Sequence, residues 1–192
     1  VQVMVKVTGG GRGMAAIAAH FRYIGKSGRL DIEDDRGNVH RGKEALHDLV
    51  EQWRYGGTPI AEIGHRREAY NIMLSMPRGT DPLTVHWAAR EFAKLELADH
   101  KYVMVLHDHQ ANPHVHISVR AESKYGRRLN PRKTDLHRWR ETFAAKLRER
   151  RQRDKQGRFL IDGVRELDRA LDAGFAPADV FICTELCTTD AA

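Results

Sequence analysis

The sequence predicts an α+β domain in which a central antiparallel β-sheet is flanked by helices. Valine-rich stretches with alternating side chains indicate strands, and stretches with apolar residues at helical spacing indicate helices. The two kinds of stretch alternate along the chain to about residue 150. The last two strands of this series are joined by a short turn that contains Asn112 and Pro113, which favours a hairpin and therefore an antiparallel sheet.

Each element follows from its own local signal. Ile17, Phe21 and Ile24 form the apolar stripe of a first helix, and Asp81 is placed to cap a later helix that begins at Pro82. In chain order, the sequence predicts a strand at 1–8, a helix at 14–26, a hairpin at 28–42, a helix at 43–55, a strand at 67–77, a helix at 81–100, strands at 101–108 and 114–122, and a basic helix at 134–153.

Size and composition are those of a globular domain. The chain has 192 residues, of which 30% are charged and 41% hydrophobic, enough for one domain with a core. No apolar run approaches the roughly 18 residues of a membrane span, and no signal-peptide pattern is present, so we expect a cytoplasmic protein. Cys183 and Cys187 lie too close to the C-terminal end to staple the domain, which agrees with a reducing compartment.

The charge is unevenly distributed around a net value of +6. Residues 122–158 hold fourteen Lys and Arg against five Asp and Glu, whereas residues 159–192 hold two against seven. A basic block beside a core indicates a polyanionic partner, most simply nucleic acid; the alternative is a solvated helix that binds nothing. The change of sign predicts two domains, 1–152 and an appendage at 153–192 that is fused or truncated and has a strand, helix and strand pattern.

Four histidines within residues 104–120 carry the main chemical signal. His114 and His116 share one face of a strand because side chains alternate along it. His107 ends the preceding strand, and a tight turn would place it opposite one of them. Three converging imidazoles with open positions are typical of a catalytic metal site. By ligand softness they suit Zn²⁺, Mn²⁺, Co²⁺ or Ni²⁺ better than Mg²⁺.

Other interpretations of this segment stay open. Asp108 or His109 could replace His107 as a ligand, or the histidines could be hydrogen-bonded without a metal. Glycines at 9–13, "GGGRG", indicate a turn between strand and helix, with a phosphate cradle built from backbone amides as the alternative. This stretch lacks the Gly-Lys-Ser/Thr ending of a P-loop, so nucleotide hydrolysis is not expected.

A metal beside a basic helix could polarise a phosphodiester, and transesterification would then need a nucleophile. Tyrosine suits this role, and the chain has five tyrosines. Tyr23 is a candidate because it shares a helical face with His20 and is followed by Gly25 and Ser27. The alternative is that Tyr23 is an amphipathic residue at the edge of the core.

Four segments resemble the conjugative relaxases of the His-hydrophobe-His (HUH) endonuclease family. "HDHQANPHVHISVR" (107–120) is similar to their histidine motif, and "AHFRYIGKSG" (19–28) to the segment with the catalytic tyrosine. "YNIMLSMPRGTDP" (70–82) resembles the middle motif, and "GRRLNPRKTDLHRWRETFAAKLRE" (126–149) the region after the histidines. The motifs occur in the family's order and cover residues 1 to about 150. They are similar to those of plasmid mobilisation relaxases and of the relaxase that starts T-DNA transfer.

The resemblance implies a relaxase-like sandwich fold and assigns roles to residues. Tyr23 would attack the scissile phosphate and form a 5′-phosphotyrosyl link. His107, His114 and His116 would hold Mg²⁺ or Mn²⁺, and Ser75 would contact DNA near the nick. Further DNA contacts are expected from the basic residues that open the last motif, namely Arg127, Arg128, Arg132 and Lys133.

The function implied is site- and strand-specific DNA nicking at an origin of transfer, for mobilisation of a conjugative plasmid or integrative element. Its partners would be single-stranded DNA, accessory relaxosome proteins and a coupling protein. One alternative is a rolling-circle replication initiator with the same chemistry. Another is a nucleic-acid-binding module without catalysis.

Two departures from the family pattern are visible. Asn71 occupies a position of the middle motif where some relatives have histidine, so activity could be weaker if that position helps to activate the tyrosine. Residues 157–187 resemble the start of the substrate-binding domain of SpoU-type RNA ribose methyltransferases. The cofactor-binding knot of those enzymes does not follow, and no activity is assigned to this piece.

Overall fold

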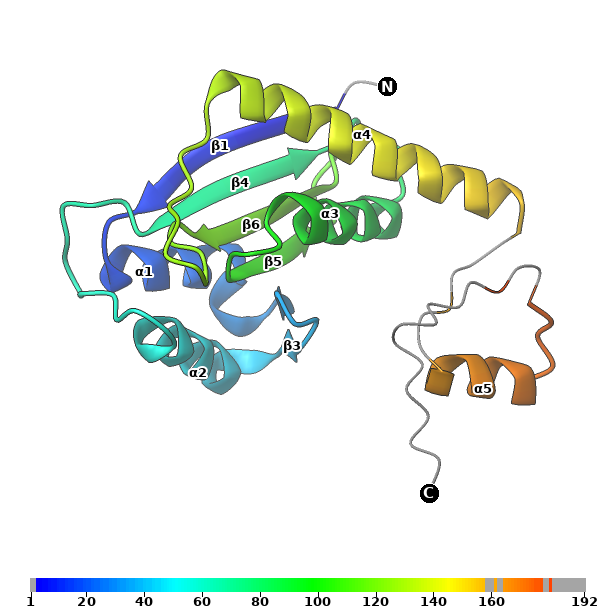
Figure 1. The fold of residues 1–192 in the computed structure, drawn as a ribbon, viewed down its shortest axis with the longest axis horizontal. Coiled ribbons are helices and arrows are strands. Elements are labelled where there is room, and N and C mark those ends of the chain that lie inside the picture. The colour runs from blue at the N-terminus through cyan, green and yellow to red at the C-terminus, as the bar shows by residue number, and fades with distance from the viewer. Residues whose placement is uncertain (1–2, 158–160, 162–163, 178–179, 181–192) are drawn as a thin grey trace. The chain divides into compact units, whose positions relative to one another are not determined.

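A computed structural model of the chain describes residues 3–157, 161, 164–177 and 180 (Figure 1). Its strands are β1 (Met4–Gly11), β2 (Ile32–Asp34), β3 (Val39–His40), β4 (Ala69–Ser75), β5 (Tyr102–His107) and β6 (His114–Arg120). Its helices are α1 (Met14–Ile24), a 3₁₀ helix (Lys26–Gly28), α2 (Gly42–Tyr55), α3 (Pro82–Glu96), α4 (Lys133–Lys155) and α5 (Val164–Asp172). The chain divides into two compact units, Val1–Arg153 and Asp154–Ala192.

The first unit is built on a six-stranded sheet with the strand order β1-β4-β6-β5-β2-β3, in which each pair of neighbouring strands is antiparallel. The predicted α+β class is therefore confirmed. β6 lies inside the sheet and pairs along its length with β4 and β5. The β5–β6 and β2–β3 hairpins form as the sequence predicts, and Asp81 caps α3 by accepting a hydrogen bond from the backbone N–H of Thr84.

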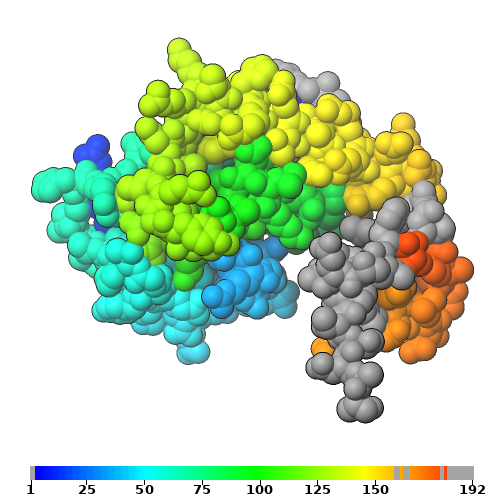
Figure 2. Space-filling model, viewed as in Figure 1, coloured from blue at the N-terminus to red at the C-terminus, as the bar shows by residue number. Residues whose placement is uncertain are grey.

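The two faces of the sheet pack against different helices. Helices α3 and α4 cover one face, where Ile72, Val115 and Ile117 of the strands belong to the same buried cluster as Phe92 and Trp139. Figure 2 shows the atoms of α4, in yellow, beside those of α3, in green. Helices α1 and α2 cover part of the other face over a second cluster, which includes Phe21, Leu49, Trp53, Val103 and Val105. The side chains of His114 and His116 alternate with Val115 and Ile117, so they lie on this second face.

The glycine run at the end of β1 corrects one prediction. Residues 9–11 continue the strand to Gly11, rather than forming part of a turn, and they pair with β4. A Cβ atom at Gly10 would lie 2.2 Å from the Ala69 carbonyl oxygen, and one at Gly11 would lie 2.6 Å from the Ile17 side chain. The glycines are needed because β4 and α1 approach the strand closely.

The C-terminal unit is described only in part. α5 (Val164–Asp172) lies within the predicted helix of the appendage, whereas the two strands predicted there fall largely outside the described residues. In the part of the chain that the structure describes, no helix combines the length and apolar character needed to span a bilayer.

An ion pair with a buried carboxylate joins β2 to α3. The Glu33 side chain is 7% exposed and accepts hydrogen bonds from Arg90 Nε at 2.5 Å and Nη2 at 2.7 Å. Burial alone would raise the pKa of Glu33, but the hydrogen bonds from Arg90 and His86 outweigh it and lower the pKa from 4.5 to about 2. By linkage, this difference corresponds to about 3 kcal/mol of stability.

Replacing Arg90 by alanine is expected to destabilise the protein by about 3 kcal/mol at pH 7, because Glu33 would stay buried without its partner. The wild-type contribution is present above about pH 4.5 and is lost as the pH falls towards 2, since the folded-state pKa is the lower one. Urea unfolding of both proteins at several pH values between 3 and 7 measures the difference. Lys94→Ala, which removes an exposed pair with Glu91, is the control and should cost less than about 1 kcal/mol. A pH-independent difference would contradict this account.

Candidate metal and nucleophile site

Three histidines converge on the face of the sheet that α1 partly covers. His107 and His114 lie directly opposite each other on β5 and β6, and His116 is two residues further along β6. One potential ligand atom of each lies within 4.8 Å of the others, and the ring centroids are 4.7 to 5.0 Å apart. Neither Asp108 nor His109 belongs to this group; His109 Nε2 instead lies 2.6 Å from Lys26 Nζ.

Backbone carbonyls orient two of the three rings. His107 Nε2 lies 2.7 Å from the carbonyl oxygen of Ile24, and His114 Nδ1 lies 2.9 Å from that of Asn112. A carbonyl oxygen only accepts, so each of these nitrogens donates and the other nitrogen of the ring keeps a free lone pair. Metal-binding histidines are commonly held in this way. His116 Nδ1 is buried and has no hydrogen-bond partner among the described residues.

The electrostatic environment keeps the rings of His107 and His116 neutral. Burial, reinforced by the neighbouring rings of His107, His114 and His20, lowers the pKa of His116 to about 4. Burial also lowers the pKa of His107. At neutral pH the two rings therefore present lone pairs rather than protons, as a metal ion requires. The donor set, its orientation and the unpartnered nitrogen together fit a divalent cation.

Helix α1, which carries the candidate nucleophile, is joined to this group at its C-terminal end. The helix begins where the N–H groups of Met14 and Ala15 bond to carbonyl oxygens of the loop before β4, at Ala61 and Glu62. Tyr23, near the other end, is 72% exposed, so a substrate can reach its ring. The adjacent residue Ile24 accepts the hydrogen bond from His107, which fixes the end of α1 to the histidine group.

His20 lies between the tyrosine and the histidines, and the sequence did not single it out as a site residue. Its ring centroid is 6.2 Å from that of Tyr23 and 6.5 Å from that of His116. Its Nε2 is buried without a partner in the described part of the chain, and burial lowers its pKa. The signal available in the sequence was its spacing, three residues before Tyr23 on the same side of a helix.

The backbone that follows α1 is strained. Lys26 and Ser27 adopt φ angles of 47° and 55°, the left-handed region that non-glycine residues seldom occupy. Such residues persist only where their surroundings hold them, and they cluster at functional sites. Here the contact between Lys26 and His109 joins this segment to the turn that follows His107.

Ser75 and Asn71 lie on the same face of the sheet as the histidines, at different positions along β4. Ser75 pairs with His114 across β4 and β6, so Ser75, His114 and His107 form one row across three strands. Its side chain is buried, with 6% of the residue exposed. Asn71 lies further along β4, where its Oδ1 accepts a hydrogen bond of 3.0 Å from the Ser118 hydroxyl. The consequence of having Asn71 rather than histidine stays a prediction.

The basic residues predicted to contact DNA lie at the other end of β6. The strand runs from His114 to Arg120, a length of about 20 Å, and the predicted DNA contacts follow it. Arg127 forms an ion pair with Asp99, and Arg128 lies within ion-pair distance of Glu68 and Glu122. The remaining two basic residues precede and open helix α4, at Arg132 and Lys133.

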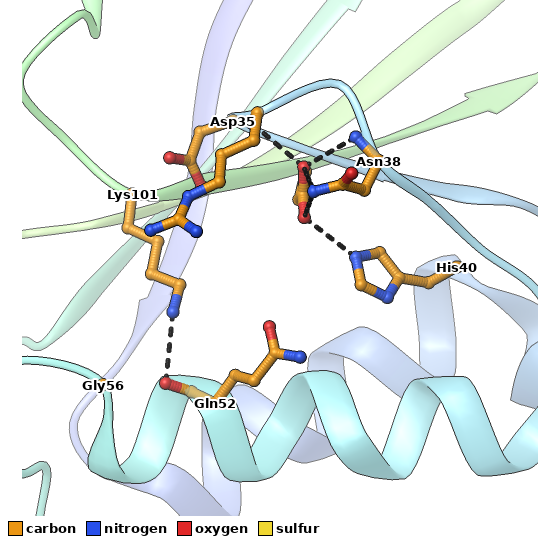
Figure 3. Close-up of a pocket in the computed structure, with 8 residues that line it drawn as sticks. Asp35, Asn38, His40, Gln52, Gly56 and Lys101 are labelled. Atoms are coloured by element: carbon orange, nitrogen blue, oxygen red, sulfur yellow. Dashed lines mark hydrogen bonds and ion pairs between the residues drawn. The ribbon is translucent and has the colours of Figure 1, made fainter.

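A separate pocket of about 500 Å³ lies between the β2–β3 turn and the end of α2 (Figure 3). Lys101 lines it from the start of β5 and donates to the Gln52 carbonyl oxygen, whereas His107 is at the opposite end of that strand. The Asp34 carboxylate accepts hydrogen bonds from the backbone of Arg36 and Asn38 and contacts His40. These contacts stabilise the β2–β3 turn. Because the pocket lies at the opposite end of β5 from His107, it is distinct from the histidine group.

Comparisons with known proteins find two family profiles and a solved structure that are similar to this chain. Residues 30–151 match the family profile described as relaxase, MobA/VirD2-like, nuclease domain, and residues 143–192 match that of the MRM3-like substrate-binding domain. No curated protein matches the chain. A solved structure described as "Molecular Basis of Vancomycin Resistance Transfer in Staphylococcus aureus" is 15% identical, with a TM-score of 0.43, and the alignment covers 83% of this chain and 95% of that one.

Proposed function

Because the chain belongs to the MobA/VirD2-like relaxase nuclease family, we propose that it nicks one strand of DNA by metal-assisted transesterification. The observation that carries the proposal is the placement of an exposed tyrosine on a helix whose end is hydrogen-bonded to a three-histidine group. The relaxase family profile ends at residue 151, before the appendage begins, so we assign the proposed activity to the first unit.

Each residue of the candidate site would have a separate role in the reaction. The Tyr23 oxygen forms a bond to the scissile phosphorus while the bond to the 3′ oxygen breaks. The phenol gives its proton to solvent, and the departing 3′ oxygen takes up a proton from solvent to become a 3′ hydroxyl. The product is a 5′-phosphotyrosyl link, which keeps a phosphodiester and so allows the strand to be rejoined. His107, His114 and His116 would hold Mg²⁺ or Mn²⁺, which when bound neutralises negative charge on the phosphoryl oxygens. Ser75 would position the DNA beside His114.

The biological setting follows from the family. The substrate would be a single strand at an origin of transfer, in the mobilisation of a plasmid or integrative element, with relaxosome proteins and a coupling protein as partners. A rolling-circle initiator would use the same chemistry. A non-catalytic binding module would hold DNA without forming a covalent link.

Covalent trapping tests the proposal directly. The protein is incubated with pooled single-stranded oligonucleotides and Mn²⁺ or Mg²⁺, and adducts that survive denaturation are separated on a gel. We expect an adduct that disappears with a chelator, and sequencing the trapped strand would give the nick site. DNA binding without an adduct, in a protein that calorimetry shows to bind no metal, would favour the non-catalytic module.

The predicted DNA contacts at the start of α4 can be tested through salt dependence. Replacing Arg132 and Lys133 together by glutamine is expected to lower the slope of log affinity against log salt by about 1.4, because each loses one single-strand phosphate contact worth about 0.7. Fluorescence anisotropy with a labelled single strand measures the slope. The pair Arg127→Gln and Arg128→Gln should change it less, since carboxylates already neutralise these arginines. An unchanged slope for the first pair would remove them from the interface.

A further inference from the structure

Lys6 occupies the same row of the sheet as His116. It lies on β1, where it pairs with Met73 of β4, and Met73 in turn pairs with His116 of β6. Paired residues of antiparallel strands project from the same face, so the Lys6 side chain is on the histidine face. Two strand spacings separate the Cα atoms of Lys6 and His116, which is about 10 Å.

The alternation of β1 presents this lysine to solvent. Val5 is buried against the helices of the opposite face, and Val7 packs against the same cluster. Lys6 between them is exposed, and so is Thr8, the next residue on its face. Met73 and His116 are themselves only partly buried. Each residue of the row from Lys6 through Met73 to His116 is therefore at least partly exposed to solvent.

No carboxylate in the described part of the chain neutralises the charge of Lys6. Among the residues that the structure describes, Lys6 Nζ makes no hydrogen bond or ion pair, whereas Arg127 and Arg128, at the other end of the strands, contact carboxylates. A lysine ammonium is a compact charge on a flexible four-carbon stem and binds phosphate as a point charge. A lysine side chain on β1 is long enough to reach over the neighbouring strand β4, about 5 Å away.

We propose that Lys6 binds a backbone phosphate of the DNA strand, next to the phosphate that the histidine group receives. This proposal rests on the proposed nicking function and extends it by assigning the edge strand β1 a part in substrate binding. The strand would cross β1 and β4 on its way to Tyr23, and Lys6 would hold its backbone without reading its sequence.

The test measures binding in a background that cannot cleave. Tyr23→Phe protein, with and without Lys6→Gln, is titrated against a fluorescein-labelled random-sequence 20-nucleotide single strand in Mg²⁺ by anisotropy. At 0.1 M salt we expect Lys6→Gln to weaken binding about fivefold and to reduce the salt slope by about 0.7, the contribution of one phosphate. Lys6→Arg should restore both. Lys94→Gln, an exposed lysine on α3 at the opposite face, is the matched control and should change neither.

The outcomes separate this contact from the nicking function. If Lys6→Gln leaves affinity and salt slope unchanged while the protein with Tyr23 intact still forms adducts, the contact is wrong and the proposed function stands. If Lys6→Gln weakens binding but no adduct forms with any oligonucleotide, the contact stands and nicking fails. With a trapped oligonucleotide, neutralising single phosphates as methylphosphonates should remove the Lys6 effect only next to the nick. A Lys6 effect that survives at every position would contradict the placement.

Discussion

Replacing Tyr23 by phenylalanine is expected to reduce covalent adduct formation at least 1,000-fold, roughly the scale on which removing a nucleophile acts. The change deletes only the hydroxyl oxygen that would bond to phosphorus. Tyr23 is 72% exposed, so little packing is lost, and the ring that lies near His20 remains. Affinity for single-stranded DNA should stay within about twofold, since no charge is altered. A labelled oligonucleotide and a denaturing gel measure the first quantity, and anisotropy measures the second.

Two other exposed tyrosines provide matched controls. Tyr55 at the end of α2 is 68% exposed and Tyr125 after β6 is 67% exposed. Phenylalanine at either position should leave adduct formation unchanged, because neither residue lies near the histidine group. An adduct of normal yield from the Tyr23→Phe protein would assign the nucleophile to another side chain.

Replacing His116 by alanine is expected to weaken Mn²⁺ binding by at least about 100-fold, since even the residues that only orient a metal ligand are worth 10- to 100-fold. The change leaves two nitrogens, His107 and His114, which cannot enclose the ion from three sides. The low pKa of His116, about 4, also keeps this candidate ligand free of competing protons at neutral pH. Calorimetric titration with Mn²⁺ gives the affinity, and adduct formation should fall with it.

The control for this variant is His137→Ala, an exposed histidine on α4 whose side chain is 73% accessible. A second readout does not depend on DNA: Mn²⁺ should raise the unfolding temperature of the wild type and of the control but not that of His116→Ala, because a ligand that binds only the folded state stabilises it. Equal Mn²⁺ affinity in wild type and His116→Ala would show that the histidine group does not hold the ion.

The fold and the histidine group were largely predictable because local rules determine them. Alternation along a strand puts His114 and His116 on one face, and the short turn brings His107 opposite His114, as the structure has it. The extent of β1 was not predictable in the same way. Three consecutive glycines carry no pattern of their own, and they form strand because they pair with β4.

The surroundings of the group depend on packing between distant parts of the chain. The contact of His109 with Lys26 joins residues 83 positions apart, and so does the bond from His107 to Ile24. No local pattern encodes such pairs. The placement of the basic residues after β6 was within reach of sequence reasoning, because residues that follow a strand lie one strand length from its start. Lys6 could also have been noticed from its alternation with Val5 and Val7.

The two parts of the candidate site differ in the sequence separation between the residues that form them. The three candidate metal ligands belong to one hairpin, with nine residues from His107 to His116, whereas Tyr23 joins them across more than eighty. Short-range contacts close early in folding and long-range ones late, since the entropy of loop closure grows with separation. A chain in which only the hairpin has formed has its candidate ligands in place and has no candidate nucleophile beside them. In the proposed reaction, cutting DNA would thereby be reserved for the completely folded protein.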